Sequence, residues 1–360
     1  MSEVVSQKKL KNNAVEFWRI VLTIAVTFFH YNMFTRLINM GDFMVFGRHI
    51  VAGGWVLGYF LFLTGYFMIS SFMRKDAKGL IDHENAYKPA WSYFWSRVKG
   101  LMPAYFLGTL FVFVARNIAI GTPLSQYPVL FFRSIFEFLG IYQLGLLGIH
   151  DCVSNADLAE MVNGEFPSGI NAGISASNTP LWNGPGWYIS AIIIVSVIIY
   201  WVLCKNKDFF LGIFCPACII ICYGFFGLVA EENWNNTVTN VLGVPDNLIR
   251  VLGGLCLGCL IYFVVEWIKN NKIAEKHPAG WNIFSIIVTL ALVITMWTGV
   301  AWNETQNNVI LLPFTVIVLV GQDSISKFLS GPLAKVSAFC GKISLYWYIS
   351  HWGWMSLLPT

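Results

Sequence analysis

The chain has 360 residues, of which 56% are hydrophobic and only 12% are charged. A soluble domain carries about 25% charged residues, so this composition excludes an ordinary soluble protein. The formal net charge of +4 is small and no basic soluble surface accompanies it, which excludes nucleic acid as a partner. Apolar runs of roughly 20 residues recur along the chain, each long enough to cross a bilayer as a helix. We predict an all-α, polytopic transmembrane helical bundle.

Ten segments are candidate membrane spans. They are 15–35, 50–73, 100–120, 128–149, 181–203, 209–230, 247–268, 281–301, 307–321 and 337–358. Lys and Arg before the first span, and between the second and third, place both segments in the cytoplasm. The expected organisation is a cytoplasmic tail, residues 1–14, followed by a single transmembrane domain, residues 15–360.

The segment 128–149 is the weakest of these spans because it contains Arg133 and Glu137. The loop 150–180 has no Lys or Arg and is predicted to be external, but ten alternating spans would place it inside. If 128–149 lies along the interface or re-enters instead of crossing, this conflict disappears. Three basic loops then fall on the cytoplasmic side: 204–208, 269–276 and 327–335.

The first span carries an unusual polar stripe. Arg19 and His30 are 11 residues apart, which on a helix is a rise of ~16 Å with almost the same facing direction. Glu16, Thr23 and Thr27 project to the same side. Lipid cannot solvate such a stripe, so its ionisable groups are candidates for a functional site. The alternative is that Arg19 reaches the interface and pairs with Glu16, while His30 is simply hydrogen-bonded near the outer boundary.

Further polar or small residues follow in later spans. Thr64-Gly65 offers a hydroxyl and a close backbone approach in the second span, with helix packing as the alternative. Arg97 and Lys99 precede Pro103 at the predicted cytoplasmic mouth of the third span. Arg116, Glu137 and Arg250 are interpreted as interface residues or, as the weaker alternative, as acceptor contacts.

The pairs Cys215/Cys218 and Cys256/Cys259 have metal-ligand spacing but lie in apolar runs without nearby His, so we predict packing cysteines and no metal site.

Aromatic residues cluster in two later segments. Leu181-Trp182 and Trp187-Tyr188 open the fifth candidate span, and ISLYWYISHW, residues 343–352, contains His351. Trp182 and Trp187 could form a sugar-stacking surface, and His351 a second site residue. For all three, an interfacial aromatic belt is the favoured interpretation.

These landmarks, taken in order, resemble the integral-membrane acyltransferase 3 family, whose members mostly O-acetylate extracytoplasmic sugars. The matching positions are Arg19 and His30, Thr64 and Gly65, Arg97 and Pro103, Leu181-Trp182 and Trp187-Tyr188, and Ser344, Tyr348 and His351. Gly100 stands where the family usually has a second Arg, and Lys99 is the candidate substitute.

The resemblance implies a multi-pass protein of the bacterial cytoplasmic membrane with acyl-CoA, commonly acetyl-CoA, as donor and no permanently bound cofactor. Arg97, Lys99 and Arg19 would bind the CoA phosphates. His30, with Arg19, would form the catalytic centre, His30 acting as general base or, less favoured, as acyl carrier. Thr64, Gly65, Trp182, Trp187, Tyr188 and His351 are the expected substrate contacts.

Two other functions remain open from the sequence. A transporter or flippase of a lipid-linked or polymeric sugar would share the composition, but it would not need a phosphate-binding cluster aligned with a buried histidine. It would also show hydropathy symmetry between halves, which is not seen here. A catalytically idle relative is the third possibility, because the second Arg is missing. No motif discriminates among peptidoglycan, capsule, lipopolysaccharide and a small molecule as acceptor.

Overall fold

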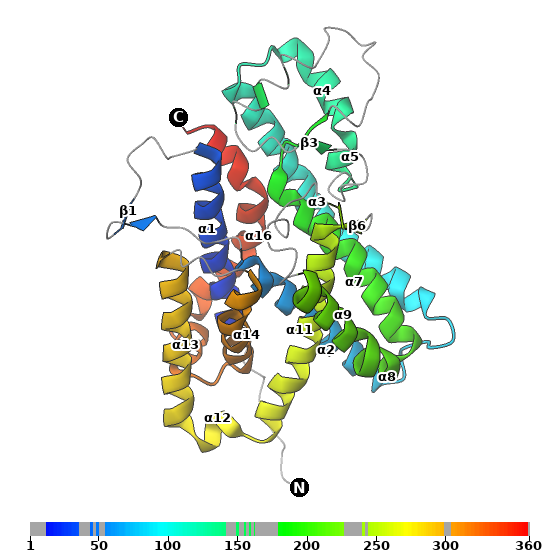
Figure 1. Ribbon diagram of the computed structural model, residues 1–360, viewed down its shortest axis with the longest axis vertical. Coiled ribbons are helices and arrows are strands. Elements are labelled where there is room, and N and C mark those ends of the chain that lie inside the picture. Colours follow the sequence, from blue (N-terminus) through cyan, green and yellow to red (C-terminus); the bar gives the residue numbers. More distant parts are fainter. Residues whose placement is uncertain are drawn as a thin grey trace.

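The computed structural model describes residues 12–35, 55–141, 181–226, 246–298 and 304–358. It also describes the short pieces 44–45, 48–49, 149–150, 155, 158–159, 162, 179–180, 240–241 and 244–245. Long helices form a bundle (Figure 1). They are α1 (Asn13–Thr35), α2 (Leu57–Asp76), α3 (Tyr87–Ala119), α7 (Trp187–Lys205), α11 (Asp246–Asn270), α13 (Pro278–Thr298), α14 (Glu304–Val320) and α16 (Ala334–Ser356).

Shorter elements connect or flank these helices. The short helices are α4 (Tyr127–Arg133), α5 (Ile135–Phe138), α8 (Lys207–Phe209), α9 (Cys215–Ile219), α12 (Ile273–Lys276) and α15 (Ser324–Ser330). Single 3-10 turns occupy Leu124–Gln126 and Gly184–Gly186, and π-helical turns occupy Phe210–Phe214 and Ile220–Phe226. Strands occur as two-residue pairs: β1 (Met44–Val45) with β2 (Arg48–His49), β3 (Ile149–His150) with β4 (Thr179–Pro180), and β5 (Asn240–Val241) with β6 (Val244–Pro245). The described chain is therefore helical, as predicted.

Six helical segments among the described residues are long and apolar enough to cross a membrane. They are Asn13–Tyr31, Tyr87–Ala119, Gly184–Lys205, Lys207–Gly224, Asn247–Asn270 and Pro278–Met296. The bent pair Asn307–Val320 and Ser324–Ser330, with an angle of 52°, would make a seventh if it is one broken span. The protein is a multi-pass membrane protein, and the predicted total of about ten spans is not confirmed.

The predicted span 128–149 does not form in its described part, residues 128–141. The chain makes α4 and α5 there, with 7 and 4 residues, and at ~1.5 Å per residue neither can cross ~30 Å of hydrocarbon. Gly140, with φ of 72°, ends this stretch in a backbone conformation that glycine adopts without strain. Residues 142–148 and most of the loop 150–180 lie outside the described residues.

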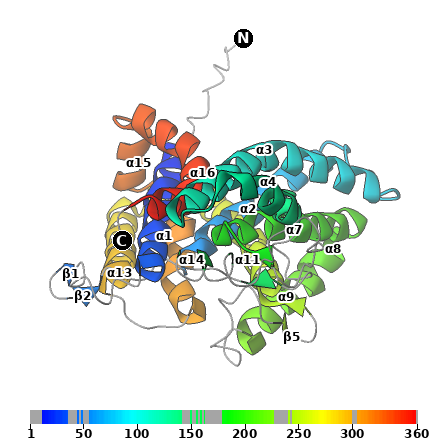
Figure 2. The same cartoon turned by 90° about the horizontal axis from the view of Figure 1, so that it is seen from above.

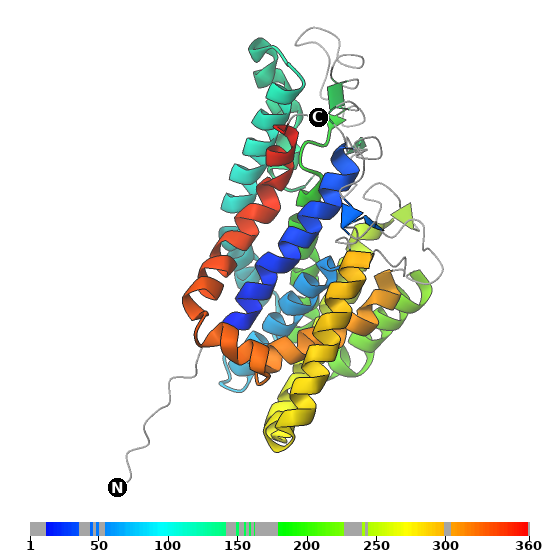
Figure 3. The same cartoon turned by 90° about the vertical axis from the view of Figure 1, so that its left-hand side faces the viewer.

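Basic connections gather at one end of the bundle. The segments joining α2 to α3, α7 to α8, α11 to α13 and α14 to α16 lie at the end where α1 begins (Figures 1 and 3). These segments include the three basic loops 204–208, 269–276 and 327–335. Their shared location agrees with the interpretation in which 128–149 does not cross. Because Lys and Arg favour the cytoplasmic side, this end remains the predicted cytoplasmic end; residues 1–11 of the tail lie outside the described residues.

Three pairs of packed helices form the centre of the bundle. α1 packs on α16, and α16 packs on α3, while α2 packs on α11 (Figure 2). The first pair is held in parallel register: Glu16 abuts Gly341 near one end, and Trp347 Nε1 donates to Thr27 Oγ1 over 2.9 Å further along. This register brings the His30 turn of α1 opposite the His351 turn of α16.

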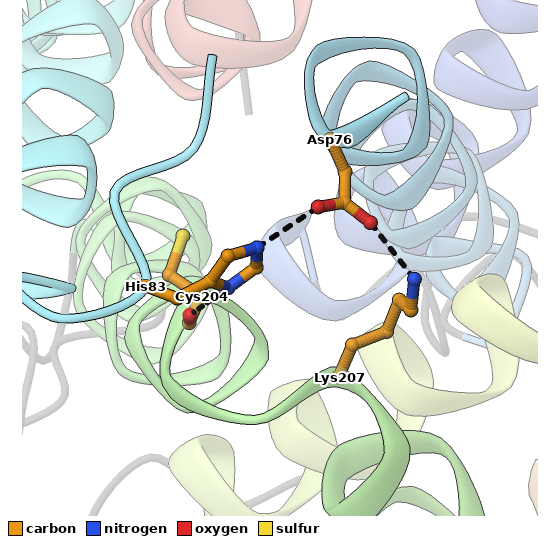
Figure 4. A network of polar contacts seen from close by, with 4 residues as sticks. All are labelled: Asp76, His83, Cys204 and Lys207. Atoms are coloured by element: carbon orange, nitrogen blue, oxygen red, sulfur yellow. Dashed lines mark hydrogen bonds and ion pairs between the residues drawn. The ribbon is translucent and has the colours of Figure 1, made fainter. Parts of the chain in front are cut away.

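A polar network joins three segments at the predicted cytoplasmic end (Figure 4). The Asp76 carboxylate lies 3.0 Å from His83 Nε2 and 2.8 Å from Lys207 Nζ, and His83 Nδ1 lies 2.8 Å from the Cys204 carbonyl oxygen. The hydrogen bond from Lys207, and secondarily that from His83, lowers the pKa of Asp76. The network ties the end of α2 to α7 and α8, although ion pairs that remain in contact with solvent contribute only about 0–1 kcal/mol.

Candidate functional site

A cavity of about 230 Å³ lies among α1, α2, α3, α7 and α16. It brings together six of the positions that match the family pattern: Arg19, Thr64, Arg97, Tyr188, Ser344 and Tyr348. The rest of the lining is largely apolar, and consists of Val15, Glu16, Thr23, Phe60, Leu63, Phe67, Leu101, Ile189, Ile192 and Leu345. Residues that are separated by more than 300 positions in the sequence therefore line the same cavity.

The charged groups of this cavity are two guanidinium groups and one carboxylate. Arg19 Nη1 lies 3.0 Å from Glu16 Oε2, so the predicted pairing within α1 is present, and Arg19 still lines the cavity. The Arg97 guanidinium lies 4.8 Å from the centroid of the Tyr93 ring, which is within cation–π range. The excess of positive charge in an otherwise apolar space favours an anionic ligand with an apolar part.

Lys99 and Gly65 are among the predicted site residues that do not line the cavity. Lys99 is exposed and does not line the cavity. Gly65 faces α11: a Cβ built there would lie 2.1 Å from the Leu255 carbonyl oxygen and 2.9 Å from the Gly258 Cα. The backbones of α2 and α11 meet at this point, so the packing alternative holds for Gly65, as small residues allow close helix contact in membranes.

We expect Gly65→Ala to lower the free energy of unfolding by about 1–3 kcal/mol, because the new methyl group overlaps a backbone carbonyl that cannot move alone. Gly100→Ala is the matched control, since a Cβ at that helical position meets nothing within 4 Å. The measurement is unfolding of the detergent-solubilised protein by heat or denaturant. Equal stability of the two variants would contradict the assigned role of Gly65.

A histidine pair lies further along α1 and α16. His30 Nδ1 is 2.8 Å from His351 Nε2, and the two rings lie nearly parallel, with centroids 5.0 Å apart and 16° between planes. Trp352 meets His30 edge-on, with centroids 5.9 Å apart. His351 is only 1% exposed, so the aromatic-belt interpretation does not hold for it. Trp347 and Trp354, by contrast, are exposed, as a belt requires.

Glu137 and Trp182 belong to a buried polar cluster, and both are 0% exposed. The Glu137 carboxylate accepts hydrogen bonds from the backbone N–H groups of Asn183, at 2.7 Å, and Trp182, at 3.1 Å. Trp182 Nε1 donates to Ser134 Oγ over 2.6 Å. The interface interpretation of Glu137 is therefore wrong. Trp182 also offers no open face on which a sugar could stack, because its whole ring is covered by protein.

Arg116 and Arg250 are likewise buried inside the protein and are not interface residues. Arg116 Nη1 donates to the Trp182 carbonyl over 2.9 Å, and its guanidinium lies 5.3 Å from the centroid of the Trp352 ring. Arg250 lies 5.8 Å from the centroid of the half-buried Trp187 ring. The sequence feature that could have predicted this cluster is the position of its charged residues inside apolar runs, because a charged side chain in a membrane segment usually faces other protein groups.

The cysteine pairs are packing residues where the structure describes them. Cys215 Sγ donates to the Cys256 carbonyl over 3.3 Å, and Cys215, Cys256 and Cys259 are buried. Within the described ranges, no group of three or more His, Cys, Asp or Glu side chains is placed to hold a metal ion.

The fold and site define a multi-pass membrane protein in which a cavity carrying two arginines and a histidine pair share the helices α1 and α16. The chain matches the family model for an acyltransferase domain over residues 12–359, and it belongs to the acyltransferase 3 family. The suspected family is thus confirmed, and with it membership of a class of membrane acyltransferases. Comparison with curated proteins and with solved structures gave no match.

Proposed function

We propose that this protein transfers an acyl group, commonly acetyl, from cytoplasmic acyl-CoA to a hydroxyl of an extracytoplasmic sugar or cell-surface glycan. The observation that supports this most is the sharing of one helix pair, α1 and α16, by the arginine cavity and the histidine pair. We place the protein in the bacterial cytoplasmic membrane, with residues 15–360 as one transmembrane acyltransferase domain behind a cytoplasmic tail, residues 1–14.

The cavity is the proposed donor site. Arg97 and Arg19 bind CoA phosphates by charge-assisted hydrogen bonds, and Arg19 exchanges its Glu16 contact for phosphate as the donor enters. The apolar lining takes the thioester arm, with the Thr64 and Tyr188 side chains beside it. Lys99, exposed on α3, adds only a point charge outside the cavity.

The histidine pair is the proposed centre of transfer. His30 removes the proton from the acceptor hydroxyl as its oxygen attacks the thioester carbonyl carbon, forming the ester C–O bond. The C–S bond breaks, CoA leaves as a thiolate, and the proton on His30 then passes to that sulfur. An acceptor entering from the outer end meets the His30 turn before it meets Arg19, because Arg19 and His30 are ~16 Å apart along α1.

Arg97→Ala is expected to weaken CoA binding by about 10- to 100-fold, because a guanidinium–phosphate contact contributes about 1.5–3 kcal/mol. Lys99→Ala is the matched control: it removes the same charge two residues away, from a side chain that does not line the cavity. Isothermal titration of CoA into the purified protein in detergent provides the comparison. Equal affinities for the two variants would exclude the cavity as the donor site.

The function itself is tested by mass spectrometry of surface glycans from cells with and without the gene. The proposal predicts glycans heavier by one or more acyl groups only when the protein is present, and their return to the lighter mass on mild alkaline treatment that cleaves esters. Glycans that change in amount but not in mass would favour a transporter or flippase instead.

A further inference from the structure

A hydrogen-bonded chain of three groups runs from the α16 backbone to His30. The Tyr348 carbonyl oxygen lies 2.5 Å from His351 Nδ1, and His351 Nε2 lies 2.8 Å from His30 Nδ1. The order of atoms in this chain restricts where the ring protons sit. Hydrogen-bond chemistry then fixes which nitrogen of each ring carries the proton.

A carbonyl oxygen can only accept, so the His351 Nδ1 must carry the proton that it donates to Tyr348. A neutral imidazole has one N–H, which leaves a lone pair on His351 Nε2. That nitrogen can only accept, so His30 Nδ1 must donate to it. In neutral His30 the remaining nitrogen, Nε2, then carries the lone pair, and it takes no part in the contact with His351.

The neighbours of His351 keep this chain in place. Tyr348, which supplies the carbonyl, is anchored by its own hydroxyl, which donates to the Pro185 carbonyl over 3.0 Å. Trp352 meets the His30 ring edge-on and packs against Gly184, where a Cβ would lie 2.4 Å from the indole. These contacts hold the α16 turn that carries His351 against residues 184–186.

We propose that His351 is a positioning residue that holds the proton of His30 on Nδ1 and so presents Nε2 as the unprotonated nitrogen for acyl transfer. This goes beyond the expected role of His351 as a substrate contact, and it rests on the proposed function only for its catalytic consequence. The tautomer itself is a property of the resting protein. The second histidine orients the first, as the orienting group does in other nucleophile–base systems.

The test measures the His30 tautomer without any substrate, by ¹⁵N NMR of the full-length protein labelled at histidine, with His30→Gln used to assign its signals. In the wild type we expect the proton on Nδ1. His351→Gln, whose amide oxygen can replace the Nε2 acceptor, should keep it there. His351→Phe keeps an aromatic ring at this position but removes the acceptor, and should shift the proton towards Nε2.

The same variants should separate in transfer activity: a loss of about 10²–10⁴-fold for His351→Phe, as for a wrong tautomer, and a much smaller loss for His351→Gln. A wild-type proton on Nε2, or an unchanged tautomer in His351→Phe, would overturn the proposal. If no variant, including wild type, transfers an acyl group, the proposed function fails, while the NMR result still decides the tautomer. Should His351→Phe not fold, the wild-type spectrum alone decides.

Discussion

Replacing His30 by Ala is expected to reduce acyl transfer by about 10²–10⁴-fold, the usual contribution of a general base. The change removes the only nitrogen that the histidine pair leaves available to an acceptor hydroxyl, because His351 donates its N–H to the Tyr348 carbonyl and directs its other nitrogen at His30. The protein should remain folded, since His30 is only half-buried and lies at the edge of the α1–α16 contact. Transfer of labelled acetyl from acetyl-CoA by the purified protein is the measurement.

His277→Ala is the matched control, because this histidine is exposed beside α12 at the other end of the bundle. It should leave transfer unchanged. The donor affinity of His30→Ala, measured with CoA, should also be unchanged, since His30 does not line the cavity. Transfer at the wild-type rate by His30→Ala would remove this residue from the mechanism.

Glu137→Ala should produce the largest loss of stability, about 2–5 kcal/mol in the free energy of unfolding. The carboxylate accepts from the backbone N–H groups of Trp182 and Asn183, and each buried donor left without its acceptor costs about 1–3 kcal/mol. The same change loosens the segment 181–186 against which Trp352 packs. Thermal unfolding in detergent, followed by tryptophan fluorescence, measures the effect.

The control for Glu137 is Glu275→Ala, which removes an exposed carboxylate on α12 and should change stability by less than about 0.5 kcal/mol. Glu137→Gln keeps the side-chain shape and one acceptor oxygen, and its loss should be intermediate. A Glu137→Ala variant as stable as the control would mean that the buried cluster does not hold this part of the fold.

Much of the helical framework could be predicted from the sequence because hydropathy reports lipid contact directly. Most of the apolar runs became helices, with ends shifted by several residues; α3 begins at Tyr87 rather than near residue 100, because its amphipathic first turns extend beyond the apolar run. The polar stripe of α1 could also be predicted from the sequence, because helical periodicity alone places Arg19 and His30 on one face. Arg19 lines the cavity and His30 contacts His351, so both ends of the stripe face protein.

Contacts between helices that are distant in the sequence could not be predicted from the sequence. Nothing in the sequence pairs His30 with His351, 321 positions apart, and an exposed and a buried aromatic helix end have the same composition. For the segment 128–149 the sequence left two alternatives open, crossing or not crossing, and the short helices α4 and α5 decide between them. Glu137 and Arg116 were interpreted as interface residues because a charge buried in protein lowers the hydropathy of a segment just as an interfacial charge does. Gly65 could have been assigned to packing only with knowledge of its partner Gly258 on α11.

Acyl transfer across the membrane is tested most directly in sealed proteoliposomes. Acceptor glycan is trapped inside vesicles containing the purified protein, and acetyl-CoA labelled in the acetyl group is added outside. We predict ester-linked label on the trapped glycan with wild-type protein and Lys99→Ala, and almost none with His30→Ala. Trapped glycan that stays unlabelled, or that leaves the vesicles unmodified, would contradict the account.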